Sequence, residues 1–295
     1  MTLTTTDQVL GTTLLEVTHH TLYRFPRRVT HCRLTAHLNP QDTEHQLVRR
    51  HSVTIDPTAE VRRQGVDARG NLVLRAEVDQ RLDRLEVTAS TFVELCTRPV
   101  PAIVVDVSWE LVAGEVSHRR FWPFLLGAQG IPLTAAIDRY ARACFQPGWS
   151  LGEGLIALLD RIGIDFADNV ESARRGGKES AELAGLTIAC LRAVGLPARF
   201  VSGYRVHPAT QHGTVHSWVQ VWTGGSWLSV DPTLGRCGRL GHLELAQGRD
   251  ALEVAPLAVE AAAGGRCLRE TTIRVRHVDM NALLEVEGAQ ESPAA

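Results

Sequence analysis

The feature that most constrains this chain is a helical stripe that ends abruptly and is followed by three strand-like runs. Five apolar residues recur at helical spacing over 181–194: Leu183, Leu186, Cys190, Leu191 and Val194. Gly195 then favours a helix C-terminus, and Pro197 prevents the helix from continuing. The strand-like runs cover 198–204, 215–222 and 227–230. This order of one helix and three strands predicts an α+β unit.

The first third of the chain has a different pattern, with short β-branched and aromatic runs between turn signals. Asp56-Pro57 ends one such run, and Gly70-Asn71 precedes another, as the turn of a hairpin does. Repeated short strands with turns between them predict a small sandwich-like or barrel-like β domain.

The length of 295 residues favours about two domains. We expect a β-rich N-terminal domain at 14–110 and an α+β core at 123–260, whose helical stretches lie between Pro123 and Asp165. Residues 261–285 form a C-terminal strand segment, because 271–278 alternates like an edge strand, and 286–295 reads as a disordered tail.

Composition excludes several classes of function. Hydrophobic residues make up 44% and charged residues 22%, which is ordinary for a globular protein, and the net charge of −2 gives no case for nucleic acid or an anionic membrane. The N-terminus lacks the pattern of a secretory signal, and no stretch approaches the ~18 apolar residues of a membrane span. The six cysteines form no C-x-x-C pair, which favours a reduced, cytoplasmic setting.

Three polar residues fall at the ends of predicted elements. Ser180 opens the helix, His216 begins the second strand run, and Asp231 ends the third. A nucleophile, a base and an acid that orients the base are what acyl-transfer chemistry needs, and a helix N-terminus can stabilise an oxyanion.

These residues lie in motifs that resemble the bacterial transglutaminase-like family, which has a papain-like fold. The resemblance runs through 177–204, which contains Gly195-Leu196-Pro197-Ala198-Arg199 and Val201-Ser202-Gly203-Tyr204, and through 215–222 and 230–233. Tyr23 and the pattern around 67–71 resemble the family's N-terminal domain, and 242–257 resembles its tail. The resemblance implies a catalytic triad whose base is His216 and whose acid is Asp231.

The departures from the family are concentrated at the start of the helix. Ser180 stands where the family has its nucleophilic cysteine, and Lys178 and Glu179 replace a glycine and a small residue. Ala181-Glu182 replaces Gln-Asp, and Gly185 replaces a histidine of the helix. The stretch between Phe166 and Ser180 also looks shorter than in the family. So many neighbouring changes indicate natural divergence.

Each site residue also has a structural interpretation. Ser180 could be a helix N-cap, His216 a structural histidine, and Asp231 the start of a turn. Trp218 and Lys178 are the candidate substrate-binding residues, although core packing is the commoner role for a tryptophan such as Trp218. Cys190 lies too far along the helix to replace the missing thiol, and Cys237 reads as an incidental thiol.

The sequence favours an enzyme that hydrolyses or exchanges amide or ester bonds through Ser180, His216 and Asp231, acting on a peptide-like, amide or ester substrate. The alternative is a catalytically inactive relative that binds a peptide or a protein partner. We predict no cofactor and no metal, because no acidic or His/Cys cluster has ligand spacing, and no nucleic-acid or membrane partner. The substrate, the acyl acceptor and the oligomeric state stay open.

Overall fold

The computed structural model describes residues 12–96, 105–115, 119–176, 178–207, 210–238, 240–261 and 267–278. The predicted tail at 286–295 lies outside these residues. The strands are β1 Thr12–Val29, β2 Cys32–Ala36, β3 Gln46–Asp56, β4 Val61–Val66, β5 Leu72–Val78, β6 Leu82–Cys96, β7 Ala198–His207, β8 His212–Trp222, β9 Trp227–Asp231, β10 Arg236–Cys237, β11 Leu243–Gly248, β12 Leu257–Ala261 and β13 Leu268–His277. The helices are α1 Trp109–Gly114, α2 Ala135–Arg142, α3 Leu151–Asp165, α4 Ala167–Arg174 and α5 Glu179–Ala193, with a 3₁₀ helix at Arg119–Phe124.

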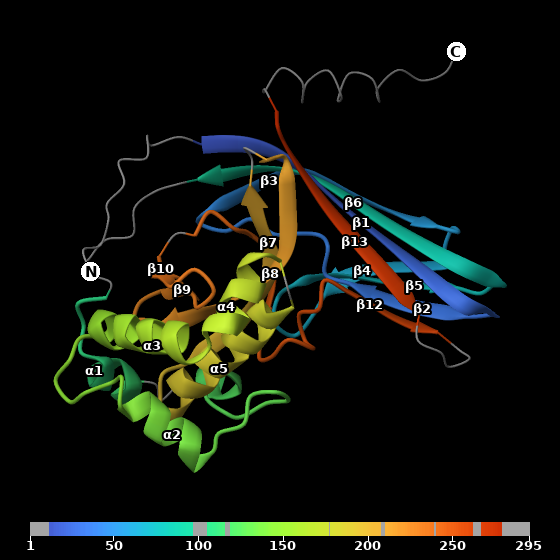
Figure 1. The fold of residues 1–295 in the computed structure, drawn as a ribbon. Helices are drawn as coiled ribbons and strands as arrows, with labels where there is room; N and C mark the ends of the chain where they lie inside the picture. The colour runs from blue at the N-terminus through green and yellow to red at the C-terminus, as the bar shows by residue number, and fades with distance from the viewer. Residues whose placement is uncertain are drawn as a thin grey trace.

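The strands form two sheets. The larger sheet has the order β10-β9-β8-β13-β1-β6-β3, and β7 and β11 extend it beside β8. The smaller sheet has the order β12-β2-β5-β4. Side chains of both sheets, such as Leu15 and Val87 from one and Leu34 and Leu74 from the other, share one buried core. The predicted α+β class, with a sandwich-like N-terminal part, is confirmed (Figure 1).

The predicted final strand exists, but it is not an edge strand. β13 pairs with β1 from Leu15↔His277 to Arg24↔Leu268, and with β8 at Ile273↔Gly213 and Arg274↔His212. Ile273 and Val275 are buried in the core between the sheets. A strand with one buried face alternates in the same way at an edge or inside a sheet, so the sequence pattern did not reveal the second neighbour.

The turn predicted at Gly70-Asn71 joins β4 and β5. One carboxylate oxygen of Asp67 accepts the backbone N–H groups of Arg69 and Asn71, at 2.7 and 2.9 Å, and Gly70 has a φ of 88°. A glycine tolerates this left-handed backbone without a steric penalty. β3 ends at Asp56, where the sequence predicted a strand end.

The helices lie together on one side of the molecule (Figure 1). α3 begins with a capping box in which Ser150 and Glu153 exchange hydrogen bonds, and it buries Leu155, Leu158 and Ile162. α5 ends as predicted, because Gly195 has a φ of 84° and the Leu196 N–H bonds the Leu191 carbonyl. In the described part of the chain, none of the helices is long and apolar enough to cross a membrane.

Several short elements are absent from the predictions. α1, the 3₁₀ helix and α4 have six, six and eight residues, too few for a clear helical repeat. α4 fills most of the stretch between Phe166 and Ser180. The strand β8 begins at His212 rather than at His216, so His216 lies within the strand.

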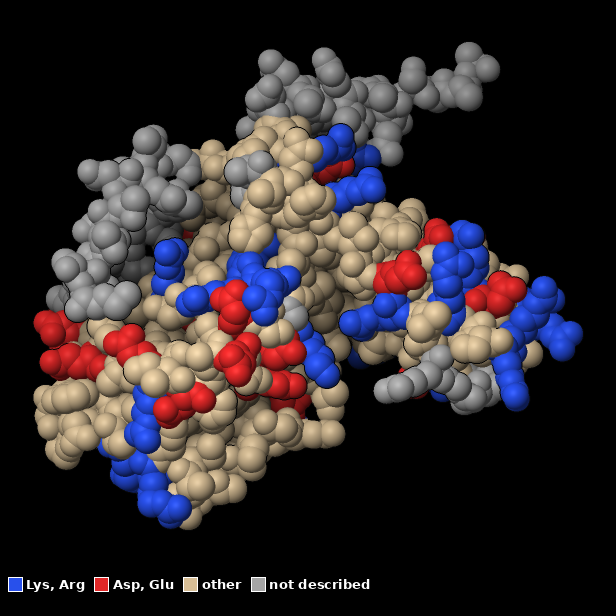
Figure 2. All heavy atoms as spheres, viewed as in Figure 1, with Lys and Arg blue, Asp and Glu red and all other residues tan. Residues whose placement is uncertain are grey.

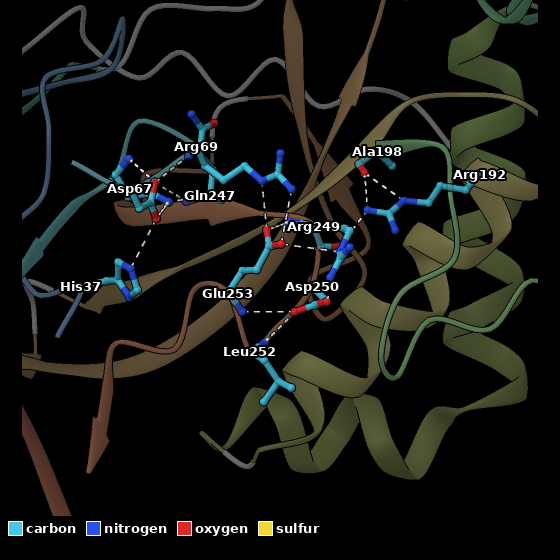
Figure 3. A network of polar contacts seen from close by, with 11 residues as sticks. His37, Asp67, Arg69, Arg192, Ala198, Gln247, Arg249, Asp250, Leu252 and Glu253 are labelled. Carbon is cyan, nitrogen blue, oxygen red and sulfur yellow. Dashed lines mark hydrogen bonds and ion pairs between the residues drawn. The ribbon is translucent and has the colours of Figure 1, made fainter. Parts of the chain in front are cut away.

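A polar network joins the N-terminal sandwich to the helical part (Figure 3). Arg69, from the β4–β5 turn, donates two hydrogen bonds to Glu253, and Asn71 bonds the backbone of Gln247 in β11. Arg192, near the end of α5, bonds the carbonyls of Ala198 and Arg249. These contacts fix the position of the N-terminal turn against the core.

Charges of both signs are interspersed over the face drawn in Figure 2. Blue and red side chains alternate above the helices and above the sheets. This agrees with the near-neutral net charge of −2.

Candidate active site

His216 and Asp231 meet on neighbouring strands. His216 lies in β8 and Asp231 at the end of β9, and Nε2 of the imidazole is 2.8 Å from Oδ2 of the carboxylate. The two side chains are 2% and 0% exposed. The N–H at Nε2 donates to the carboxylate, which leaves the lone pair on Nδ1. Among the described residues nothing hydrogen-bonds Nδ1, so this atom is available as a base.

A second histidine, His242, shares the same carboxylate oxygen. Its Nε2 lies 2.9 Å from Oδ2 of Asp231, and its side chain is only 3% exposed. The other oxygen, Oδ1, accepts the backbone N–H groups of Thr233 and Leu234 at 2.8 and 3.2 Å. Both oxygens of the buried Asp231 carboxylate are therefore hydrogen-bonded. His242 lies at the start of the 242–257 stretch that resembles the family's tail, and nothing in the sequence pattern predicts its contact with Asp231.

The electrostatics of the three groups follow from these bonds. Burial acts to raise the pKa of Asp231, but the hydrogen bonds from His216 and His242 outweigh it and hold the pKa well below its ordinary value. Burial lowers the pKa of His242, and the bond to Asp231 only partly offsets this. Asp231 is therefore ionised at neutral pH, and His242 is a neutral donor.

Ser180 lies at the N-terminal end of α5, where it is 4% exposed. The helix begins at Glu179 and its N-cap residue is Lys178, so the interpretation of Ser180 as the N-cap is wrong. Ser180 is the second helical residue, and its hydroxyl makes no hydrogen bond with any described residue.

The α4–α5 connection lies beside the His216–Asp231 pair. A Cβ built on Gly176 would come within 2.9 Å of the Thr214 side chain, and Thr214 precedes His216 by two residues on β8. Residues two apart on a strand share a face. Arg174 donates to the carbonyl of Thr233, two residues after Asp231, at 2.9 Å. The start of α5 therefore lies close to the face that bears His216.

The two candidate substrate-binding residues differ in their surroundings. Trp218 is 2% exposed and packs against both histidines, with its ring centroid 6.3 Å from that of His216 and 5.1 Å from that of His242. It is therefore buried against the two imidazoles of the candidate site. Lys178 is exposed at the start of α5. The pKa of Glu179 is lowered by its own backbone N–H, by Ser172 and, least, by Lys178.

The cysteines supply no replacement nucleophile at this site. Cys190 is fully buried in the helical core, and burial raises its pKa to about 12. Cys237 lies in β10 opposite Val230, next to the Asp231 position, but burial raises its pKa as well. A raised pKa keeps the thiol protonated and unreactive.

The donor atoms of His216, Asp231 and His242 lie within 4.8 Å of one another, so the set could hold a metal ion. Two imidazole nitrogens and one carboxylate oxygen suit zinc or iron. The same atoms are fully satisfied by hydrogen bonds to one another, so their geometry needs no ion. His207 and His212 face each other across the β7–β8 pairing and are not part of this set.

Comparisons with known proteins identify the family. Residues 15–94 match the bacterial transglutaminase-like N-terminal region, and residues 163–232 match the transglutaminase-like superfamily. The second range contains Ser180, His216 and Asp231. This range begins near the end of α3 and ends just after β9, so it includes α5, the β8–β9 hairpin and Asp231.

Similar proteins occur in mycobacteria. An uncharacterised protein of Mycobacterium tuberculosis strain H37Rv is 30% identical over 280 residues, which cover 84% of this chain and 87% of the relative. One from Mycobacterium leprae is 27% identical over 261 residues and covers 82% of this chain and 91% of the relative. A crystal structure from Cytophaga hutchinsonii, provisionally named a cysteine protease, shares the fold with a TM-score of 0.70 at 16% identity, over 92% of each chain. The chain belongs to the transglutaminase-like superfamily and carries the bacterial N-terminal region of that family.

Proposed function

We propose that this protein is an acyl-transfer enzyme that uses Ser180 as nucleophile, His216 as general base and acid, and Asp231 to orient His216. Its substrates are amides or esters of peptide-like molecules. The observation that carries the proposal is the buried hydrogen bond of 2.8 Å between His216 Nε2 and Asp231 Oδ2. It fixes the tautomer that leaves Nδ1 ready to accept a proton.

The reaction has two stages. The Ser180 hydroxyl gives its proton to Nδ1 of His216 as its oxygen adds to the carbonyl carbon of the substrate. His216 then passes the proton to the leaving amine or alcohol as the C–N or C–O bond breaks, and the acyl group stays on Ser180. Water or an amine, deprotonated by His216, takes the acyl group and restores the hydroxyl.

The first turn of α5 supports this chemistry. Backbone N–H groups at a helix N-terminus lack partners within the helix, and the helix dipole adds a partial positive charge there. The N–H of Ser180 is in this turn, so we assign it as a donor to the oxyanion of the tetrahedral intermediate. Lys178 is exposed beside it and adds positive charge.

Labelling with a fluorophosphonate probe tests the proposal. We expect the native protein to be labelled at one serine, and Ser180→Ala to lose the label while keeping its circular dichroism spectrum. Ser217→Ala is the matched control, because Ser217 is also buried and follows His216 on β8, but its side chain points to the other face. His216→Ala should slow labelling by at least about 10²-fold.

The second candidate function is an inactive member of the family that binds a peptide or a protein. One observation favours it: within the described residues, the Ser180 hydroxyl and Nδ1 of His216 do not form a hydrogen bond with each other. Catalytic contacts in proteins without substrate are often long, and a rotation about χ1 of Ser180 moves its oxygen. Absence of labelling in the folded native protein, or equal labelling of Ser180→Ala, would favour the binding function.

A further inference from the structure

A pocket of about 420 Å³ lies away from the proposed catalytic residues. It is lined by residues of the β4–β5 turn, the 3₁₀ helix, β7, the β8–β9 hairpin and β11. One lining residue, Trp222, is six residues from His216 along β8, which corresponds to about 20 Å. The pocket is therefore at the Trp222 end of β8, away from His216 in the middle of that strand and from Asp231 at the far end of β9. Its volume is in the range of small-molecule sites.

Four aromatic rings form one wall of this pocket. Phe121 lies 5.0 Å from Trp222 and 6.2 Å from Trp227 between ring centroids. Phe124 meets Trp227 edge to face at 5.4 Å, and the two tryptophans meet edge to face at 5.6 Å. Aromatic side chains that line a pocket favour a planar apolar group, which they contact by offset stacking or edge to face.

Three guanidinium groups lie over these rings. Arg199 lies 4.3 Å from the Trp227 centroid, Arg120 lies 4.7 Å from Phe121, and Arg69 lies 5.5 Å from Phe124. A guanidinium held over an aromatic ring by a cation–π contact still carries several N–H donors. Such N–H groups suit the two oxygens of a carboxylate or phosphate.

The charge of the pocket is positive. Its lining, taken from the described residues, contains the three arginines and no acidic side chain. The positive charges of two of the arginines are offset by nearby acidic residues that do not line the pocket. Arg69 is paired with Glu253 (Figure 3), and Arg199, whose pKa burial lowers to about 10, donates to Gln220 and is attracted by the half-buried Glu244.

Arg120 is different, because its charge has no such compensation. It lies over Phe121 and Trp222 and is exposed, and no ion pair joins it to a carboxylate in the described ranges. An anion that enters the pocket would meet one uncompensated guanidinium beside flat aromatic surfaces.

We infer that this pocket binds a small planar aromatic compound that carries a carboxylate or phosphate group. The ring of the ligand stacks within the aromatic wall, and its anionic group is bound by Arg120. The site lies between the N-terminal turn, which contributes Arg69 and Ala68, and the core hairpin, so the ligand contacts both. The inference does not depend on catalysis at Ser180.

Isothermal titration calorimetry with three probes tests the inference: 2-naphthoate, 2-naphthyl phosphate and the neutral 2-naphthamide. We expect at least one anionic probe to bind, and the amide to bind at least about tenfold more weakly. Whichever of the two anionic probes has the lower Kd shows whether the pocket prefers a carboxylate or a phosphate. Arg120→Gln should weaken the anionic probe by about tenfold, because it loses a charged donor on an exposed side chain without disturbing the core.

Arg119→Gln is the matched control. Arg119 precedes Arg120 on the same 3₁₀ helix, but its guanidinium lies over the exposed Trp122 and does not line the pocket. It should leave Kd unchanged, as should Ser180→Ala at the distant end of α5. The inference would be overturned if the anionic probe bound the native protein and Arg120→Gln equally well, or if Arg119→Gln weakened binding as much as Arg120→Gln does. It would also be overturned if the amide bound as tightly as the anions, or if neither anion bound at about 1 mM.

Discussion

The hydroxyl of Tyr204 lies 2.8 Å from Nδ1 of His19, and this buried bond joins the core strand β7 to the first strand of the chain. Tyr204 comes from the Val-Ser-Gly-Tyr motif, and its ring is part of the core between the two sheets. Nε2 of His19 bonds Thr21 at 2.7 Å. A neutral imidazole therefore accepts from the tyrosine and donates to the threonine.

Acid should destabilise the protein through His19. Burial, with smaller effects of Arg269 and His20, lowers the pKa of His19 to about 4. The unfolded chain, with a histidine pKa of about 6.5, binds the proton first, so stability is full above about pH 6.5 and falls as the pH drops toward 4. The loss should amount to about 3 kcal/mol, measured by urea unfolding between pH 7 and 4.

The variant His19→Gln provides the control, because glutamine keeps one donor and one acceptor but does not titrate. Its stability should fall less over the same range. Burial also lowers the pKa of His51 to about 4, and that residue contributes to both curves, so only their difference reports on His19. Parallel curves for the two proteins would contradict the prediction.

His242 should support the charge of Asp231. His242→Ala removes one of the two imidazole donors to Oδ2, and the free energy of unfolding at pH 7 should fall by about 1–3 kcal/mol. The low pKa of Asp231 stabilises the fold above about pH 4, and this contribution is lost as the pH falls further; without the His242 donor the pKa lies closer to its unfolded value, so the variant should lose less stability below pH 4 than the native protein. His242→Gln, whose amide can donate, should recover part of the stability. Identical acid unfolding of His242→Ala and the native protein would refute this role.

Removal of metal should leave the protein unchanged. Both oxygens of Asp231 are occupied by donors, so the His216–Asp231–His242 cluster is stable without an ion. We expect the same melting temperature before and after dialysis against EDTA. A lower Tm after dialysis that Zn²⁺ restores would show that the cluster holds a metal.

Two glycines of α3 should respond in opposite ways to alanine. A Cβ on Gly154 would lie 2.3 Å from the ring of Phe145, whereas a Cβ on Gly163 meets nothing within 4 Å. Gly154→Ala should therefore destabilise the protein by about 1–3 kcal/mol through overpacking. Gly163→Ala should stabilise it by about 0.5–1 kcal/mol through the better helix propensity of alanine. Urea unfolding of the two variants checks both, and a stable Gly154→Ala would contradict the packing.

The parts of the site that the sequence predicted well depend on local rules. His216 and Asp231 lie at positions where strand alternation and a following proline restrict the geometry, and the structure brings their side chains into contact. The end of α5 was predictable from Gly195 and Pro197 for the same reason. Ser180 was placed correctly at the start of this helix, although one residue inside it.

The parts that the sequence did not predict depend on long-range packing. His242 precedes β11 and reaches Asp231 only because β11 pairs with β7. The 3₁₀ helix is short, and its Arg120 and Phe121 form a pocket only together with Trp222 and Trp227, which are distant in the sequence. The spacing of residues within one segment does not predict contacts between residues that are far apart in the sequence.

The location of β13 has a consequence for synthesis. The last described strand of the chain inserts between β1 and β8, so the side of β1 from Leu15 to Arg24 has no partner until residues 268–277 have been synthesised. A nascent chain would expose that side, and an exposed unpaired strand is a template for aggregation. Truncation before Leu268 would therefore leave β1 without this partner from Leu15 to Arg24 and remove the strand that joins β1 to β8.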